Sequence, residues 1–260
     1  MSLLLNVAFV THRGPGKNGL NQDAVLVDGQ CYAGISMEQA ESLTYHTSKP
    51  GLLAISDGVG SAPHAHKASE KVLTFLRDTL KEEAPFSPTR VIRNIQNRME
   101  NLAMEKPRFR GMAATLAALY IERREAIAFN TGDSRIYLMR GEKLKRLSRD
   151  HTQLQRMLDH GEISAEKAEG LSDIYSALEG YLVAGELEEE ALPVEVSRLE
   201  LRQRDLLLLC SDGVSDLVSD HEMEEILSMK EDALTKCKRL FRTAYASGVD
   251  DLSIIVAEVL

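Results

Sequence analysis

The sequence has few cysteines, and none are spaced for a disulfide framework or a zinc ribbon. Its 260 residues contain three, Cys31, Cys210 and Cys237, and no CxxC pair occurs. Scattered cysteines in odd number are typical of proteins in a reducing compartment. We therefore expect a cytoplasmic protein without structural disulfides, in which Cys210 is a buried thiol at the end of an apolar run.

An excess of basic charge and long apolar runs are also missing. The chain has 31 Lys and Arg against 40 Asp and Glu, a formal net charge of -9. Nucleic-acid binders usually carry a basic excess, so we expect no nucleic-acid partner. The N-terminal "MSLLLNVAFV" is too short for the roughly 20 apolar residues of a membrane span, and it lacks the features of a signal peptide. We expect no membrane segment, and a buried strand at residues 3–10.

Several familiar catalytic motifs are absent as well. The sequence contains no GxxxxGK[ST], HExxH, GxSxG or GxGxxG, and no EF-hand loop. These patterns mark phosphate loops, zinc proteases, serine hydrolases, dinucleotide sites and calcium sites. Any chemistry of this chain must therefore rest on other residues.

The chain does contain enough apolar residues for a substantial core. The hydrophobic fraction is 43%, which excludes global disorder. No repeat and no composition shift marks a linker, so we expect residues 1–260 to form one domain. Strand and helix patterns are mixed rather than strictly alternating. This favours an α+β fold with antiparallel sheets and separate helical layers.

Periodicity predicts the individual elements. The short connections within residues 113–147 predict an antiparallel meander, because a parallel crossover needs about a dozen residues. Residues 31–50 show no clear period and are predicted to form a loop or insertion. The other predicted elements are a strand at 51–56, a strand pair at 194–200 and 205–210, a strand at 252–259, and helices at 64–82, 88–105, 150–180 with interruptions, 220–229 and 231–246.

Aspartates stand at many predicted strand ends, beside glycine or another turn former. Two apolar runs, "LLAISDGVG" and "LLLCSDGV", both end in Ser-Asp-Gly-Val. Clustered carboxylates repel one another, and a divalent cation relieves that cost. Oxygen ligands favour Mg²⁺ or Mn²⁺ over Zn²⁺. Asp-Gly is also a common turn, so both roles are open for each residue. The aspartates concerned are Asp23, Asp57, Asp133, Asp212, Asp250 and Asp251.

Basic and titratable side chains near these aspartates are further candidates. The segment "THRGPGKNGLNQD" holds Arg13 and Lys17 among small and amide residues. Arg13 could form a forked contact with a phosphate, or lie in a solvated turn. His64 and His66 follow the first Ser-Asp-Gly-Val and are either surface histidines or proton donors.

The ordered motifs resemble the metal-dependent protein phosphatase family of the 2C type, from about residue 9 to residue 259. The most specific piece is "GDSRIYLMRG" followed by "DHT". The other pieces are "RGPGKNGLNQD", "DGVGSAPHAHKAS", "GMAATLAAL", "LLLLCSDGVSDLVSD" and "GVDDLSIIV". The resemblance implies an α-β-β-α sandwich with two central antiparallel sheets. It also implies a serine/threonine phosphatase of the bacterial kind.

The resemblance further implies two Mn²⁺ or Mg²⁺ ions and a role for each aspartate. Asp57 would bridge the two ions, and the Gly58 carbonyl would bind one of them. Asp212 and Asp250 would supply the other carboxylates, and Asp23 would orient a metal-bound water. The implied reaction is attack on phosphorus by a water that bridges the ions.

Two more roles come from the same resemblance. Asp133, together with Asp212, would hold a third and weaker ion, and Arg13 would bind the phosphate. Phosphorylated proteins, the products of a serine/threonine kinase, are the implied partners of a monomeric enzyme. Residues 150–193 lie where family members carry a flap, which we expect to influence substrate choice.

The sequence also departs from the family pattern without losing a proposed metal carboxylate. The departures bear on rate and substrate range. They leave two alternatives open: a weakly active or inactive phosphatase-fold module for interaction or sensing, and a phosphohydrolase that acts on small molecules. The departing residues are Ser61 and Ala65 in place of glycine, Ala113 and Ala114 in place of glycine and threonine, and Asp251 in place of asparagine.

Overall fold

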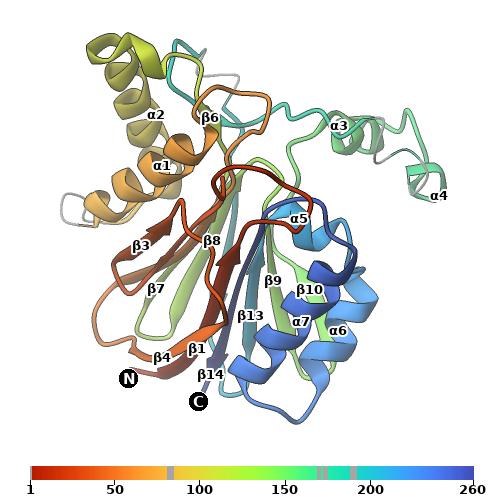
Figure 1. The fold of residues 1–260 in the computed structure, drawn as a ribbon. Coiled ribbons are helices and arrows are strands. Elements are labelled where there is room, and N and C mark those ends of the chain that lie inside the picture. The colour runs from red at the N-terminus through yellow and green to blue at the C-terminus, as the bar shows by residue number, and fades with distance from the viewer. Residues whose placement is uncertain (1, 81–84, 169–170, 172–174, 188–191) are drawn as a thin grey trace.

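Two antiparallel sheets form the centre of the computed structural model, which describes residues 2–80, 85–168, 171, 175–187 and 192–260 (Figure 1). The first sheet has the order β10 (Lys143–Arg146), β9 (Arg135–Arg140), β13 (Leu206–Cys210), β14 (Leu252–Val259), β1 (Leu4–His12) and β4 (Glu41–His46). The second has the order β12 (Glu195–Glu200), β8 (Glu125–Thr131), β7 (Leu116–Glu122), β5 (Gly51–Ser56), β2 (Ala24–Val27) and β3 (Gln30–Ala33).

Helices cover the outer side of each sheet. Helices α1 (Ala65–Thr79) and α2 (Pro88–Glu105) pack together, and α1 contacts β2, β3 and β5 of the second sheet. Helices α6 (Asp220–Ser228) and α7 (Ala233–Ser247) lie over the first sheet, where α7 contacts β1 and β14 (Figure 1). The predicted α-β-β-α sandwich is confirmed.

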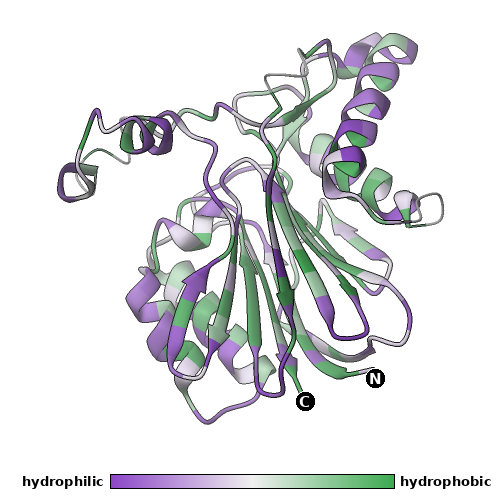
Figure 2. Ribbon diagram, turned by 180° about the vertical axis from the view of Figure 1, so that it is seen from behind, coloured by the Kyte–Doolittle hydropathy of each residue, from purple (hydrophilic) through white to green (hydrophobic). Residues whose placement is uncertain are grey.

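The strand β5 shows how this layering arises from the sequence. All six of its residues are buried. Leu53 and Ile55 belong to the core between the sheets, whereas Leu52 and Ala54 belong to the core beneath α1 and α2. A strand covered on both faces needs apolar residues at every position, which is why "GLLAIS" is a continuous run. Figure 2 shows the central strands as the most hydrophobic part of the molecule.

Helix boundaries follow local signals. The first residue of α2 is Pro88, a position at which the missing amide hydrogen costs nothing. Helix α6 begins with a capping box, in which Ser219 and Glu222 each bond the other's backbone amide. The predicted helix at 88–105 is confirmed at both ends. The helix predicted at 64–82 forms as α1, and its last two predicted residues lie outside the described residues.

The prediction that residues 31–50 form a loop is wrong. This segment contains β4 and most of β3, which are the outermost strands of the two sheets. An edge strand buries little of its surface. Four of the six residues of β4 are exposed, so the apolar alternation that marks a strand is weak.

The predicted meander is correct only in part. Strand β7 pairs with β8, and β9 pairs with β10, but β8 and β9 belong to different sheets. The link between them turns at Gly132, whose φ of +105° suits glycine. Likewise β12 pairs with β8 and β13 pairs with β9 and β14, so residues 194–200 and 205–210 are strands but not partners.

Smaller elements complete the described chain. Strands β6 (Ala113–Ala114) and β11 (Leu182–Val183) pair with each other. In the described part of 150–180 the pattern forms α3 (Gln153–Asp159) and α4 (Ala165–Ala168), and the predicted break at "EGLSD" falls largely outside the described residues. The remaining elements are η1 (Pro107–Phe109) and α5 (Asp212–Ser215). A helix of the length and apolarity that a membrane span requires is not found in the described part of the chain.

Candidate metal centre

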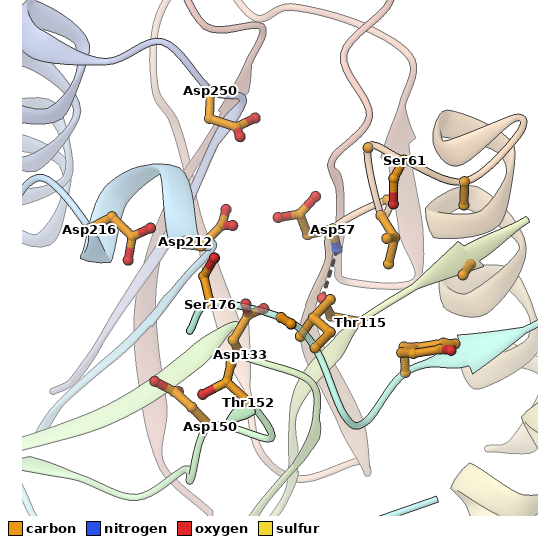
Figure 3. Close-up of a pocket in the computed structure, with 18 of the residues that line it drawn as sticks. Asp57, Ser61, Thr115, Asp133, Asp150, Thr152, Ser176, Asp212, Asp216 and Asp250 are labelled. Atoms are coloured by element: carbon orange, nitrogen blue, oxygen red, sulfur yellow. Dashed lines mark hydrogen bonds between the residues drawn. The ribbon is translucent and has the colours of Figure 1, made fainter. Parts of the chain in front are cut away.

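An acidic cavity of about 820 Å³ opens where the two sheets meet at one end of the sandwich. Carboxylates come to it from both sheets (Figure 3). Asp57 follows β5 of the second sheet, Asp212 follows β13 of the first, and Asp250 lies just before β14. Asp133 lies in the link that carries the chain from one sheet to the other. The acidic residues that line the cavity are Asp57, Asp133, Asp150, Asp212, Asp216 and Asp250.

Backbone contacts fix the loop that carries Asp57. The Asp57 N–H donates to the Thr115 hydroxyl at 3.1 Å, and the Thr115 N–H donates back to the Asp57 carbonyl at 2.8 Å (Figure 3). The Thr115 hydroxyl also lies 2.8 Å from that of Ser134. Gly58 follows, with its N–H donating to the Gln22 carbonyl at 3.2 Å. The loop is therefore held on both sides, which aims the Asp57 carboxylate into the cavity.

The second Ser-Asp-Gly-Val is the start of a helix rather than a turn. Residues Asp212–Ser215 form α5, and the Asp216 N–H donates to the Asp212 carbonyl at 2.8 Å. One helical turn separates Asp212 and Asp216, so both carboxylates line the cavity. The sequence prediction included Asp212 but missed Asp216. The four-residue spacing is the signal that could have revealed it.

The carboxylates disturb one another strongly. Burial raises the pKa of Asp57 well above its usual range, and the nearby charges of Asp23 and Asp212 raise it further. Burial and the charge of Asp212 raise the pKa of Asp133 to about 7. The pKa of Asp212 is raised as well, first by burial. Such groups cannot all ionise without a cation between them.

The donor atoms fit a hard divalent ion. Asp212 Oδ1 is buried without a hydrogen-bond partner, and so is Asp23 Oδ1. Oxygen ligands of this kind suit Mg²⁺ and Mn²⁺. In the described residues no group of three or more His, Cys, Asp or Glu side chains already has the arrangement of a metal site.

Asp23 lies behind the cavity rather than on its wall. It is fully buried, and its Oδ2 accepts a hydrogen bond from the Ser211 hydroxyl at 2.7 Å. Ser211 immediately precedes Asp212, so this bond links Asp23 to the segment that carries Asp212, and the charge of Asp23 acts on Asp57. The predicted role of Asp23 in orienting a metal-bound water stays a prediction.

The structure does not bring Arg13 together with the carboxylates. Its guanidinium is exposed, donates to the Gly19 carbonyl at 3.0 Å, and is not among the residues that line the cavity. Lys17, from the same segment, lines the cavity instead and forms an ion pair with Asp250. Burial alone would lower the pKa of Lys17, but the bond to Asp250 and the charge of Asp251 raise it above its usual value. The ammonium is therefore fully charged.

The two candidate histidines also lie outside the cavity lining. His64 is exposed at the start of α1, and its ring contacts that of Phe109 at a centroid distance of 5.5 Å. His66 is half-buried in the first turn of α1. Neither lines the cavity, so the described structure does not support a role as proton donor for either histidine.

A family model for protein phosphatase 2C matches residues 36–251. The chain belongs to the protein phosphatase 2C family. It is 28% identical over 219 residues to the serine/threonine phosphatase stp of Listeria innocua, covering 81% of this chain and 85% of that protein. It is 31% identical over 217 residues to the serine/threonine protein phosphatase PstP of Mycobacterium tuberculosis, covering 80% of this chain and 40% of PstP.

Solved structures agree with this membership. The catalytic domain of PstP, in complex with two manganese ions, superposes with a TM-score of 0.75 at 27% identity and covers 99% of both chains. The crystal structure of the Mycobacterium tuberculosis serine/threonine phosphatase PstP/Ppp gives a TM-score of 0.77 at 28% identity and covers 98% of this chain and 99% of that chain. The predicted family and fold are confirmed. With the family comes metal-dependent protein phosphatase activity.

In this 2C-family chain, residues of the segment predicted to be a flap contribute to the cavity lining. Among them are Thr152, Leu154, Leu178 and Tyr181. An isolated bridge joins Thr152 to Leu178 within this segment. An effect of this segment on substrate choice stays a prediction, and residues 188–190 of the acidic run at 185–190 lie outside the described residues.

The raised pKa of Asp133 predicts how the metal-free protein responds to pH. Its pKa is raised from 3.8 to about 7, so between these two pH values the folded protein keeps a proton on Asp133 that the unfolded chain has released. The contribution of Asp133 to the unfolding free energy is therefore fully present below pH 3.8 and is lost as the pH rises toward 7. In EDTA, we expect the fall in unfolding free energy between pH 5 and 8 to be smaller for Asp133→Asn, by on the order of 1–3 kcal/mol.

Urea denaturation of both proteins at the two pH values measures this difference. His151 acts in the opposite direction, because burial, and then the charge of Arg149, lower its pKa to about 4. Its contribution is the same in both proteins and cancels in the comparison. An equal pH dependence for wild type and variant would contradict the assignment.

Proposed function

We propose that the chain hydrolyses phosphoserine and phosphothreonine in proteins, with two Mn²⁺ or Mg²⁺ ions held by Asp57, Asp212, Asp250 and the Gly58 carbonyl. The observation that carries this proposal is the meeting of carboxylates from both sheets in one cavity, with a buried Asp212 oxygen left without a partner. Asp133 lies beside Asp212, and we propose this pair as the ligands of a third ion.

The chemistry is divided between the ions and the chain. When bound, the ions would lower the pKa of a water molecule and neutralise charge on the phosphoryl oxygens. The chain supplies the ligands, and Thr115 and Gln22 hold the Asp57 loop in place. It also supplies positive charge for the phosphate. Lys17 stands in the cavity for that role, while the sequence-based role of Arg13 in phosphate binding stays a prediction.

The setting of the enzyme is also proposed. The relatives named above are serine/threonine phosphatases of bacteria, so phosphoproteins made by a serine/threonine kinase are the expected substrates. The three cysteines are free, and Cys210 and Cys237 are buried, which supports a reducing, cytoplasmic setting. We further propose that residues 1–260 act as one domain and as a monomer.

Metal removal and return test the proposal. Protein stripped with EDTA should not hydrolyse p-nitrophenyl phosphate or a phosphothreonine peptide, and Mn²⁺ should restore both activities. Turnover in EDTA would rule out the metal mechanism. Metal binding without turnover would favour the interaction module. Turnover of small phosphoesters with no activity on any phosphopeptide would favour a small-molecule phosphohydrolase.

A further inference from the structure

Two adjacent aspartates at the start of β14 have different surroundings. Asp251 is 1% exposed, and its carboxylate accepts N–H bonds from Gly14 at 3.2 Å and from Gln22 at 2.9 Å. The side chain of Asp250 is 46% exposed and lines the cavity. Asp251 thus fixes the segment that precedes β2, whereas the carboxylate of Asp250 is partly exposed at the cavity wall.

Lys17 joins these two aspartates. Its ammonium forms an ion pair with Asp250 and lies 3.3 Å from Asp251 Oδ2. It also lies 3.5 Å from the side-chain oxygen of Gln22. Arg135, the other cation that lines the cavity in the described residues, donates to Asp150 at 2.9 Å and is committed there. Lys17 is therefore the positive charge that balances the Asp250 end of the cavity.

We propose that Lys17 is a built-in counter-cation of the metal centre, which a metal ion must displace from Asp250 in order to bind there. Asp251 is the positioning residue that retains the displaced ammonium at the cavity wall. This inference rests on the proposed metal site. It adds that metal affinity is set by competition within the chain as well as by the ligands.

The buried carboxylate of Asp251 explains how the exchange can occur without losing Lys17. A neutral asparagine, the residue of the family pattern, has one acceptor oxygen and could keep only one of the two N–H bonds that Oδ1 and Oδ2 of Asp251 accept from Gly14 and Gln22. It also carries no negative charge to attract an ammonium. An ionised carboxylate 3.3 Å away gives Lys17 a second partner when Asp250 turns to a metal ion. The pairing of Lys17 with Asp251 is a feature of this chain.

Calorimetric titration of metal-free protein with Mn²⁺ tests the competition directly, without any assay of turnover. We expect Lys17→Met to bind Mn²⁺ about tenfold more tightly than the wild type, because the competing ion pair is gone. Lys17→Arg keeps the charge and should retain the weaker binding. Lys67→Met is the matched control: Lys67 pairs with Glu70 on α1 at 2.7 Å, outside the cavity lining, and should leave the affinity unchanged.

A second variant tests the role of Asp251. Asp251→Asn should weaken Mn²⁺ binding several-fold, because the released ammonium then pairs with Asp250 alone. Unchanged Mn²⁺ affinity in Lys17→Met, or tighter binding in Asp251→Asn, would overturn the inference. Circular dichroism establishes that each variant is folded. If wild-type protein neither binds Mn²⁺ nor gains activity from it, the proposed function has failed. If wild-type protein is active with Mn²⁺ but Lys17→Met binds Mn²⁺ with unchanged affinity, only this inference has failed.

Discussion

Asp57→Asn is expected to lower Mn²⁺-dependent kcat on p-nitrophenyl phosphate by about a thousandfold or more. Asp57 is the carboxylate that the second sheet contributes to the proposed centre, and its loop is held by backbone bonds that asparagine leaves intact. The lost stabilisation is therefore electrostatic. A thousandfold loss in rate corresponds to about 4 kcal/mol of transition-state stabilisation by the metal ions, since each 1.36 kcal/mol changes the rate tenfold.

The same substitution should stabilise the metal-free protein. Burial and neighbouring carboxylates raise the pKa of Asp57, so its ionised form is unfavourable in the folded state when no cation is bound. Thermal melting in EDTA at pH 8 should show a higher Tm for the variant. Asp78→Asn on α1, where Asp78 pairs with Arg98 at 3.1 Å, is the matched control and should change neither quantity much. Full activity in Asp57→Asn would remove Asp57 from the mechanism.

Gly58→Ala is expected to cost both stability and activity. A Cβ at this position would lie 2.6 Å from the carbonyl carbon of Ala65 and 2.9 Å from the carbonyl oxygen of Gln22. Both are backbone atoms that cannot rotate away. We expect a loss of about 1–3 kcal/mol in unfolding free energy, as for other overpacked sites. Displacing the metal loop by about 1 Å should also lower kcat by about a hundredfold.

Gly60→Ala provides the contrast, two residues further along the same loop. There the nearest atom to a new Cβ is the side-chain oxygen of Gln22, at an ordinary 3.5 Å. Its unfolding free energy should stay within about 0.5 kcal/mol of the wild type. Urea denaturation and Mn²⁺-dependent turnover of both variants measure the difference. Equal behaviour of the two would mean that the Gly58 backbone is not tightly packed.

The sequence predicts the covered parts of this fold better than its edges. Helix α2 could be delimited because its apolar stripe is long and Pro88 marks its start. The edge strands β3 and β4 could not, because they bury too little surface to need a regular pattern. The change of sheet at Gly132 was missed because a short link fits a hairpin and a crossing between stacked sheets equally well.

The candidate site shows a similar division. Carboxylates such as Asp57 and Asp212 could be predicted because the residue type itself and the ordered motifs around it indicate metal binding. The distinction between Arg13 and Lys17 could not, because it depends on how the Gly14–Gln22 segment folds against the buried Asp251. The role of Asp216 depends on whether Ser-Asp-Gly-Val turns or begins a helix, and Asp212 and Asp57 differ in that respect.

The position of β14 determines when the centre can first exist during synthesis. This strand comes after every other element in the chain order, yet it lies inside its sheet, between β13 and β1. Asp250 stands two residues before it. Until β14 has left the ribosome, the first sheet therefore consists of two separate parts, β10-β9-β13 and β1-β4. We expect such a nascent chain to be unable to take up metal in the way that the finished fold does.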